Sequence, residues 1–299
     1  MLISVVIPHF NQPAHLARGL AALTAQQDEA PCEILVVDNN SENLPAEVVA
    51  GFPGVRLLSE TTPGPGPARN TGVAAASGDI LAFIDADCIA RPGWLAVIAE
   101  RIGQGADILG GDVRIHHQAP GRPTVWEAYE SEFAYRMEHY IRRQGFTGTG
   151  NLAMRRAVYD AVGPFAGIGV AEDRDWGQRA TGGGYAITWA PEMRADHPAR
   201  VDFSELARKW DRHIAHDFPK ALAAPGGRVK WALKTAAMLV SPLAMIPRVA
   251  LSRRIEGGVG GKIKAFAGLV RVRAYRARRM AGLIAARDSG RLSARWREN

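Results

Sequence analysis

The chain is poor in cysteine, with only Cys32 and Cys88 among its 299 residues. Two cysteines beside apolar segments do not make the disulfide framework of a small secreted domain, so we expect two buried free thiols. The first eight residues contain no basic segment and no cleavage site of small residues, and they predict a first strand in place of a signal peptide. These absences favour the cytosolic side of a membrane.

A long uncharged hydrophobic run is also missing. Residues 231–251 are mostly apolar, but Lys234 and Arg248 leave only the 13 residues 235–247 between them. A helix that spans a bilayer needs about 20 apolar residues, so we expect no span here. Residues 263–286 mix apolar and basic side chains and resemble an amphipathic helix at a membrane surface. The alternative for both segments is ordinary packing against the body of the protein.

Charge is distributed unevenly along the chain, whose net charge is +7. Residues 228–299 carry 17 Lys and Arg against 3 Asp and Glu, a net of +14, and residues 1–227 carry 20 against 27, a net of −7. A basic tail suggests an anionic partner, either phospholipid or nucleic acid. Because residues 252–295 offer only Phe266 and Tyr275 for stacking on bases, we expect an anionic membrane surface and no nucleic acid.

Apolar runs alternate with segments of helical periodicity through the first two hundred residues. This alternation predicts a doubly wound, mostly parallel α/β sheet that binds ligands at the carboxyl ends of its strands. We expect a catalytic domain over 1–225 and a basic helical extension over 226–299. Strands are predicted at 3–7, 32–37, 55–58, 80–84, 108–115 and 186–189, and helices at 15–26, 68–76, 92–102, 126–143 and 172–179. Residues 64–67 and 145–151 are predicted to be loops.

Two carboxylates, Asp85 and Asp87, follow the apolar run at residues 80–84. Burying such a pair is costly unless it is hydrogen-bonded or meets a cation. Hard oxygen ligands suit Mg2+ or Mn2+, ions that commonly hold substrate phosphates as well. The alternative is that one carboxylate caps a helix and the other is solvated.

Two further polar residues lie at predicted strand and loop ends. Asp38 ends a strand, where it could accept hydrogen bonds from a nucleotide or could cap a helix. Arg69 follows a Gly/Pro loop and offers a rigid donor fork for a base or a phosphate. The loop lacks the third glycine of a dinucleotide fingerprint and the Lys-Ser/Thr of a P-loop.

Together these pieces resemble the inverting nucleotide-sugar glycosyltransferases of family 2, which have the GT-A fold. The resemblance runs from Ser4 to about His197. Its pieces are Ser4-Val5-Val6-Ile7-Pro8-His9-Phe10-Asn11, Val36-Val37-Asp38-Asn39-Asn40-Ser41, Ala68-Arg69-Asn70-Thr71-Gly72, Asp85-Ala86-Asp87, residues 148–156 and Ala171-Glu172-Asp173-Arg174-Asp175-Trp176. The fold it implies is a Rossmann-like mixed sheet flanked by helices.

The resemblance implies a role for each matching residue. Asp173, with Glu172, would be the general base that takes the proton of the acceptor hydroxyl. The metal, Mn2+ or Mg2+, would be bound by Asp87, Asp85 and His197. Asn151, Gly150 and Trp176 would face the sugar or acceptor, although a core tryptophan is the alternative for Trp176. The donor nucleotide would contact Pro8, Phe10, Asn11, Asp38, Asn40, Arg69, Asp85 and Ala86.

The implied reaction transfers one sugar from a nucleotide-diphosphate sugar, with UDP as the expected nucleotide, to a glycan or lipid-linked acceptor with inversion. Polysaccharide, lipopolysaccharide or glycolipid assembly for the cell envelope, at the cytoplasmic face of the inner membrane, is the expected setting; a cytoplasmic location is the alternative. The Gln-x-x-Arg-Trp motif of processive synthases is missing, and Arg208-Lys209-Trp210 is its nearest approach. A sugar-nucleotide pyrophosphorylase and a non-catalytic protein that binds anionic lipid or nucleic acid are the alternative functions.

Overall fold

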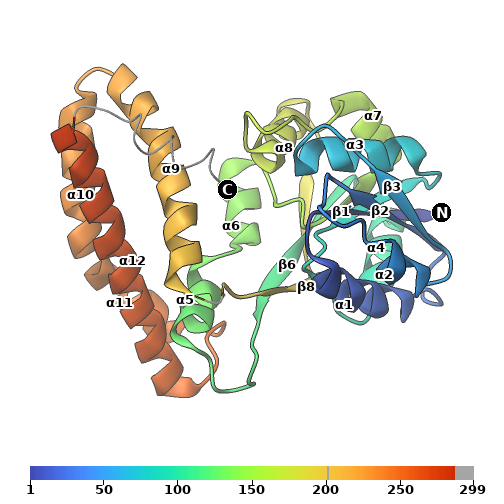
Figure 1. The fold of residues 1–299 in the computed structure, drawn as a ribbon, viewed down its shortest axis with the longest axis horizontal. Helices are drawn as coiled ribbons and strands as arrows, with labels where there is room; N and C mark the ends of the chain where they lie inside the picture. Colours follow the sequence, from blue (N-terminus) through green and yellow to red (C-terminus); the bar gives the residue numbers. More distant parts are fainter. Residues whose placement is uncertain (201, 287–299) are drawn as a thin grey trace. The chain divides into compact units, whose positions relative to one another are not determined.

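The computed structural model describes residues 1–200 and 202–286, and its chain forms two compact units (Figure 1). The first unit comprises Met1–Arg114 and Tyr135–Pro198, and the second comprises Ile115–Ala134 and the chain from Ala199 onward. The predicted boundary after residue 225 does not coincide with this division. The helix that precedes that boundary buries Ile214 and Phe218 beside Trp231, and therefore belongs to the second unit.

A mixed sheet of eight strands forms the centre of the first unit, in the order β3-β2-β1-β4-β7-β6-β8-β5. The pairs β1–β2, β1–β4 and β2–β3 are parallel, whereas β7 runs antiparallel to β4 and β6, and β5 runs antiparallel to β8. The mostly parallel sheet predicted from alternation is therefore only the first half. The strands are β1 (Ile3–His9), β2 (Cys32–Asp38), β3 (Val55–Ser59), β4 (Ile80–Ile84), β5 (Ile89–Ala90), β6 (Ile108–His116), β7 (Asn151–Arg155) and β8 (Ile187–Pro198).

Helices cover both faces of this sheet because successive strand residues point to opposite sides. Val5 packs into one hydrophobic core and Val6 into the other. Leu16, Leu20 and Trp94 cover the first face, whereas Val158 and Trp176 cover the second. The helices of this unit are α1 (Pro13–Thr24), α2 (Ala46–Ala50), α3 (Pro65–Ala75), α4 (Trp94–Gly103), α6 (Met137–Gln144), α7 (Arg156–Val162) and α8 (Glu172–Gly182).

Two predicted boundaries differ from the structure. Pro65–Pro67, predicted as loop, forms the first turn of α3, since a proline fits where a helix has no amide partner. Gly66 is required there, because a Cβ would lie 2.0 Å from the carbonyl oxygen of Ala166. The single helix predicted over 126–143 is broken between Phe133 and Met137, where Tyr135 has a φ of +46° and the chain passes from one unit to the other.

Asn151 corrects a predicted role. Its side chain is completely buried at the start of β7. The amide nitrogen donates to the carbonyl oxygens of Asp112 and Met193 at 2.9 and 2.8 Å, and the amide oxygen accepts from the Trp94 indole at 2.9 Å. Both ends of the amide are thus used to join β6, β8 and α4, and no part of it faces a sugar.

Trp176 is a core tryptophan, which was the alternative to a contact with the sugar. It is buried in the core, and its indole donates to the carbonyl oxygen of Gly163 at 2.9 Å. It is therefore not placed to stack on a sugar ring.

The second unit is helical and contains three hydrophobic clusters together with ion pairs to buried carboxylates. Its helix α5 (Val125–Phe133) buries Glu130, which pairs with Arg200, and Glu132, which pairs with Arg248 and accepts from Ser252. Buried carboxylates are tolerated when such partners meet them. The other helices are α9 (Phe203–Ala223), α10 (Gly227–Ala244), α11 (Ile246–Leu251) and α12 (Gly258–Ala286).

The structure changes one prediction for the tail and leaves the other a prediction. The apolar residues of α12 are divided, because Leu269, Val272 and Met280 are buried within the unit whereas Ile263, Val270 and Ile284 are exposed. The segment Gly227–Leu251, which contains the residues predicted to be too short for a span, is long and apolar enough to cross a membrane by length and composition alone. The segment is apolar enough for a span because its many apolar residues keep the average hydropathy high in spite of a few charged residues.

Substituting Asn151 tests its structural role. In Asn151→Ala the Trp94 indole and two strand carbonyls lose their partner, so we expect the free energy of unfolding to fall by about 3 kcal/mol. Urea denaturation measures this change. Gln104→Ala, at the exposed end of α4, is the control and should change stability by less than about 0.5 kcal/mol. Equal effects of the two substitutions would contradict the assigned role.

Candidate active site

The candidate site lies at the carboxyl ends of the parallel strands, where ligands bind in such sheets. Strand β2 ends at Asp38, β1 ends at His9, and β4 leads directly into Asp85. Because β2, β1 and β4 are neighbours, these side chains share one edge of the sheet.

Arg69 connects two parts of this site that lie far apart in the sequence. Its guanidinium, projecting from α3, donates to Asp85 at 2.7 Å and to Glu172 at 3.1 Å. The residue is only 2% exposed, and within the described residues its Nε has no hydrogen-bond partner. In the structure the fork points toward two carboxylates, and the predicted contact of Arg69 with a base or a phosphate stays a prediction.

Gly150 explains how Asp85 is accommodated. A Cβ at this position would lie 2.4 Å from a carboxylate oxygen of Asp85, so the carboxylate occupies the space that any side chain would need. Gly150 was expected to face the sugar or acceptor. In the structure it is the backbone surface against which Asp85 packs.

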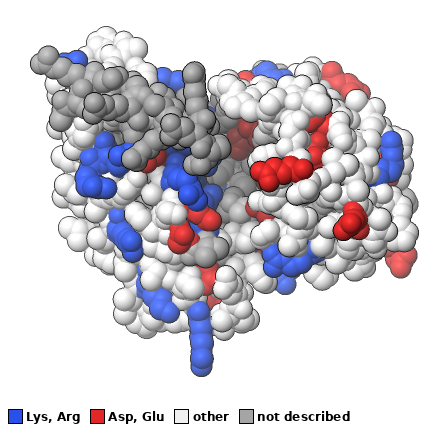
Figure 2. Space-filling model, in the orientation of Figure 1, with Lys and Arg blue, Asp and Glu red and all other residues white. Residues whose placement is uncertain are grey.

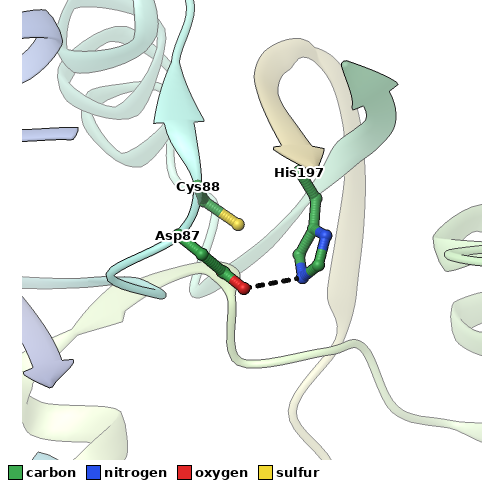
Figure 3. Close-up of side chains that lie close together, drawn as sticks. All are labelled: Asp87, Cys88 and His197. Carbon is green, nitrogen blue, oxygen red and sulfur yellow. Dashed lines mark ion pairs between the residues drawn. The ribbon is translucent and has the colours of Figure 1, made fainter. Parts of the chain in front are cut away.

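Asp87 and His197 approach each other because β5 pairs with β8. Their antiparallel pairing sets Ile89 opposite Asp196. Asp87 and Cys88, which precede β5, therefore lie beside His197 on β8. His197 Nε2 lies 3.2 Å from Asp87 Oδ2, and Figure 3 shows the two side chains pointing toward each other with Cys88 beside them.

Tyr135 is a member of this cluster that the sequence reasoning missed. Its hydroxyl lies 2.9 Å from His197 Nε2, and its ring centre lies 4.6 Å from that of the imidazole. No sequence motif marks it, since it follows a helix break sixty residues before His197. Its positive φ is the structural sign that the backbone is constrained here.

The residues present fit a divalent cation. Asp87 Oδ1 is buried without a hydrogen-bond partner among the described residues, and the ligand atoms of Asp87, Cys88 and His197 lie within 4.8 Å of one another. His197 Nδ1 donates to the carbonyl oxygen of Pro198 at 2.6 Å, an arrangement typical of a metal-binding imidazole. Oxygen and imidazole ligands suit Mn2+ or Mg2+.

Electrostatics also favour positive charge beside Asp87. Burial alone would raise the pKa of Asp87, but the hydrogen bond and charge of His197 outweigh burial and hold that pKa below its usual value. Burial would lower the pKa of His197, and contact with Asp87 raises it overall. Burial, together with the charges of Asp87 and Asp85, raises the pKa of the Cys88 thiol, so Cys88 stays neutral and is a poor ligand for a hard cation.

Glu172 and Asp173 begin helix α8, where the helix dipole stabilises acidic side chains. Asp173 is half-buried and accepts a hydrogen bond from the amide of Arg174 at 2.7 Å. Burial, followed by the negative charge of Glu172, raises the pKa of Asp173. A carboxylate with a raised pKa is a stronger proton acceptor.

On the nucleotide side, Asp38 is buried against His9, which the sequence reasoning did not single out. His9 Nδ1 lies 2.8 Å from Asp38 Oδ1, and His9 Nε2 accepts from the amide of Gln12, so Nδ1 is the ring nitrogen that donates to Asp38. The other carboxylate oxygen accepts from the amide of Ser41. Contact between Asp38 and a base therefore stays a prediction.

The remaining predicted nucleotide residues lie at the end of β1 and in the loops after β1, β2 and β4. Asn11 and Asn40 have φ angles of +51° and +64°, which asparagine tolerates better than most residues, and their side chains tie neighbouring loops together. Phe10 is exposed, and Pro8 is half-buried. Ala86 is buried between the two carboxylates.

Comparison with known proteins identifies the class to which this fold and site belong. The model of the glycosyl transferase family 2 matches residues 4–163. The chain is 35% identical over 218 residues to glycosyltransferase AglE of Haloferax volcanii, covering 70% of this chain and 71% of that protein. It is 28% identical over 179 residues to an uncharacterised glycosyltransferase of Nostoc sp., covering 55% of this chain and 54% of that one.

Solved structures agree with this assignment at the level of fold. The mannosyltransferase PcManGT of Pyrobaculum calidifontis, in complex with GDP-Man and Mn2+, superposes with a TM-score of 0.58 at 17% identity, covering 95% of this chain and 86% of that one. Glucosyl-3-phosphoglycerate synthase of Mycobacterium tuberculosis, with Mn2+, UDP and phosphoglyceric acid, gives 0.50 at 25% identity, covering 69% and 74%.

This chain belongs to glycosyltransferase family 2. It is an enzyme with the GT-A fold that uses nucleotide sugars, as the sequence motifs predicted. Similar enzymes have been crystallised with Mn2+ or Mg2+, which agrees with the predicted cofactor.

The contact between Gly150 and Asp85 can be tested by adding one methyl group. In Gly150→Ala the Cβ displaces the Asp85 carboxylate from Arg69, so we expect the rate of nucleotide-sugar turnover to fall at least about tenfold. The control is Gly182→Ala in α8, where a Cβ meets nothing within 4 Å. Turnover of Gly150→Ala equal to that of this control would show that the position of Asp85 does not matter.

Proposed function

We propose that the enzyme transfers a single sugar from a nucleotide-diphosphate sugar, with UDP as the nucleotide, to an acceptor hydroxyl with inversion of configuration. The observation that carries this proposal is Arg69, which joins Asp85 on the donor side to Glu172 beside the proposed base. Release of nucleoside diphosphate from a panel of UDP-, GDP- and dTDP-sugars tests it. Release of pyrophosphate instead would favour the pyrophosphorylase alternative.

The donor is proposed to bind at the strand edge that carries Asp85, Asp87 and His197. These residues would hold Mn2+ or Mg2+, and such an ion neutralises charge on the departing nucleoside diphosphate. Contacts from Pro8, Phe10, Asn11, Asp38 and Asn40 would complete the nucleotide pocket. The UDP complex of the similar phosphoglycerate-dependent synthase supports UDP as the first nucleotide to test.

Asp173 is the proposed general base. It would accept the proton of the acceptor hydroxyl while the acceptor oxygen bonds to the anomeric carbon, and the bond from that carbon to the diphosphate oxygen breaks on the opposite face. One displacement of this kind inverts the configuration. Its raised pKa and its position next to Glu172 support this assignment.

A glycan or lipid-linked acceptor at an anionic membrane surface is the proposed setting. The net charge of +14 over residues 228–299 supports such a surface, since each basic residue near anionic lipid adds to binding. The enzyme would be peripheral at the cytoplasmic face of the inner membrane and act in polysaccharide, lipopolysaccharide or glycolipid assembly. Without a Gln-x-x-Arg-Trp motif, it would add one sugar per encounter.

Asp173→Asn tests the base. The amide cannot accept the proton, so we expect the turnover rate to fall about 100- to 10,000-fold while the fold persists. Asp175→Asn is the matched control on the same helix, because Asp175 pairs with Arg179 at 3.0 Å and has no proposed role in the reaction. Near-normal turnover of Asp173→Asn would contradict the assignment of Asp173 as the general base.

The pH dependence provides a second test of Asp173. Only the deprotonated carboxylate acts as a base, so the rate should fall as the pH drops through a pKa above the usual aspartate value. Glu172→Gln removes the neighbouring negative charge and should move this acid limb to lower pH. Because Asp173 stays buried in this variant, its pKa, and with it the acid limb, should remain above the usual aspartate value. A limb that stays in place would mean that a different group titrates.

Asp87→Asn and His197→Ala test the metal ligands without requiring a sugar substrate. Each should weaken Mn2+ binding, measured by electron paramagnetic resonance of free Mn2+, at least about tenfold. Asp28→Asn, an exposed carboxylate after α1, is the control. Unchanged affinity in both ligand variants would mean that the ion binds elsewhere.

A further inference from the structure

The outward side of α10 and α11 is apolar along its whole length. Leu239 is 61% exposed, Leu243 is 66% exposed and Leu251 is 80% exposed. Isolated apolar residues on a surface are ordinary, but a continuous set on one helical segment marks an interaction surface. We call this set the α10–α11 face; its large members are Val229, Leu233, Leu239, Val240, Leu243, Ile246 and Leu251.

The opposite side of the same segment is attached to the second unit. Trp231, Met238, Pro242 and Val249 are buried at roughly heptad spacing, as expected for one side of a helix. The Trp231 indole donates to the carbonyl oxygen of Met280, and both belong to one hydrophobic core. The segment is therefore attached to the unit at its beginning, middle and end.

The charged residues within the segment that carries this face are all basic. Residues 218–255 contain no Asp or Glu, and basic residues flank the apolar positions on both sides, including Arg228, Lys230 and Arg253. Figure 2 shows Lys and Arg side chains among uncharged atoms over the part of the molecule that Figure 1 labels α12. Apolar residues bordered by cations complement the anionic headgroups and acyl chains of a membrane.

We propose that α10 and α11 lie in the plane of an anionic membrane, with the α10–α11 face inserted at the boundary between headgroups and acyl chains. This inference rests on the membrane setting of the proposed function and assigns the contact to α10 and α11. The sequence placed this contact in residues 263–286. In the structure α12 buries Leu269, Val272 and Met280 in the core of the unit and exposes fewer large apolar residues than α10 and α11 do.

Vesicle binding of the full chain tests this assignment. The probes are vesicles of phosphatidylcholine and phosphatidylglycerol in equal parts, and vesicles of phosphatidylcholine alone. The variant is Leu239→Gln with Leu243→Gln, which removes two exposed leucines without entering the core. Leu44→Gln with Ile168→Gln, two exposed apolar residues of the first unit, is the matched control.

We expect the α10–α11 variant to bind anionic vesicles at least about tenfold more weakly than the wild type, and the control to bind normally. Wild-type binding should be weaker on vesicles of phosphatidylcholine alone. Equal binding by both variants, or no binding by the wild type, would overturn the proposal. So would a change of oligomeric state in the α10–α11 variant with unchanged vesicle binding, because the face would then be a protein interface.

Nucleoside-diphosphate release without vesicles separates this inference from the proposed function. The α10–α11 variant should release nucleoside diphosphate from a soluble donor as the wild type does. Circular dichroism melting should show that the variant remains folded. If the wild type binds vesicles but releases no nucleoside diphosphate from any donor, the proposed function fails while the membrane assignment stands.

Discussion

One buried guanidinium connects the parts of this enzyme on which its chemistry depends. Arg69 donates to Asp85 at the end of a strand and to Glu172 at the start of a helix more than eighty residues later. A buried cation is tolerated only with such partners, and removing both carboxylates would leave its charge uncompensated. The planar fork also fixes direction, because it meets both carboxylates at once. The donor side and the base side therefore cannot move independently without breaking this contact.

A change of strand direction completes the site. The parallel strands β2, β1 and β4 bring the strand-end carboxylates to one edge of the sheet. The antiparallel pairing of β5 with β8 then places His197 beside Asp87. Asn151 holds the strands around this junction through three buried hydrogen bonds. The second unit is helical, and it leaves an apolar face on α10 and α11. Catalysis and membrane contact are thus assigned to separate units.

Much of this architecture could be predicted from local sequence. Strand β4 has the predicted bounds, and the acidic pair directly after it lies at the ligand-binding edge. The predictions failed where a residue's environment depends on distant chain segments. Nothing near Asn151 shows that Trp94 and two strand carbonyls would enclose its amide, and nothing near Tyr135 shows that it would meet His197. Nothing near Leu269 or Met280 of α12 shows that they would be buried, because the helices that cover them, α5, α9 and α10, lie elsewhere in the sequence.

The stereochemistry of the product tests the central claim most directly. The donor that the enzyme turns over can be incubated without an acceptor, so that water takes the acceptor position, and the first sugar released can be followed by proton NMR before it mutarotates. A single displacement assisted by Asp173 predicts that an α-linked donor first yields the β-anomer. The α-anomer as the first product would contradict the account, because the attack would then not occur from the face opposite the diphosphate.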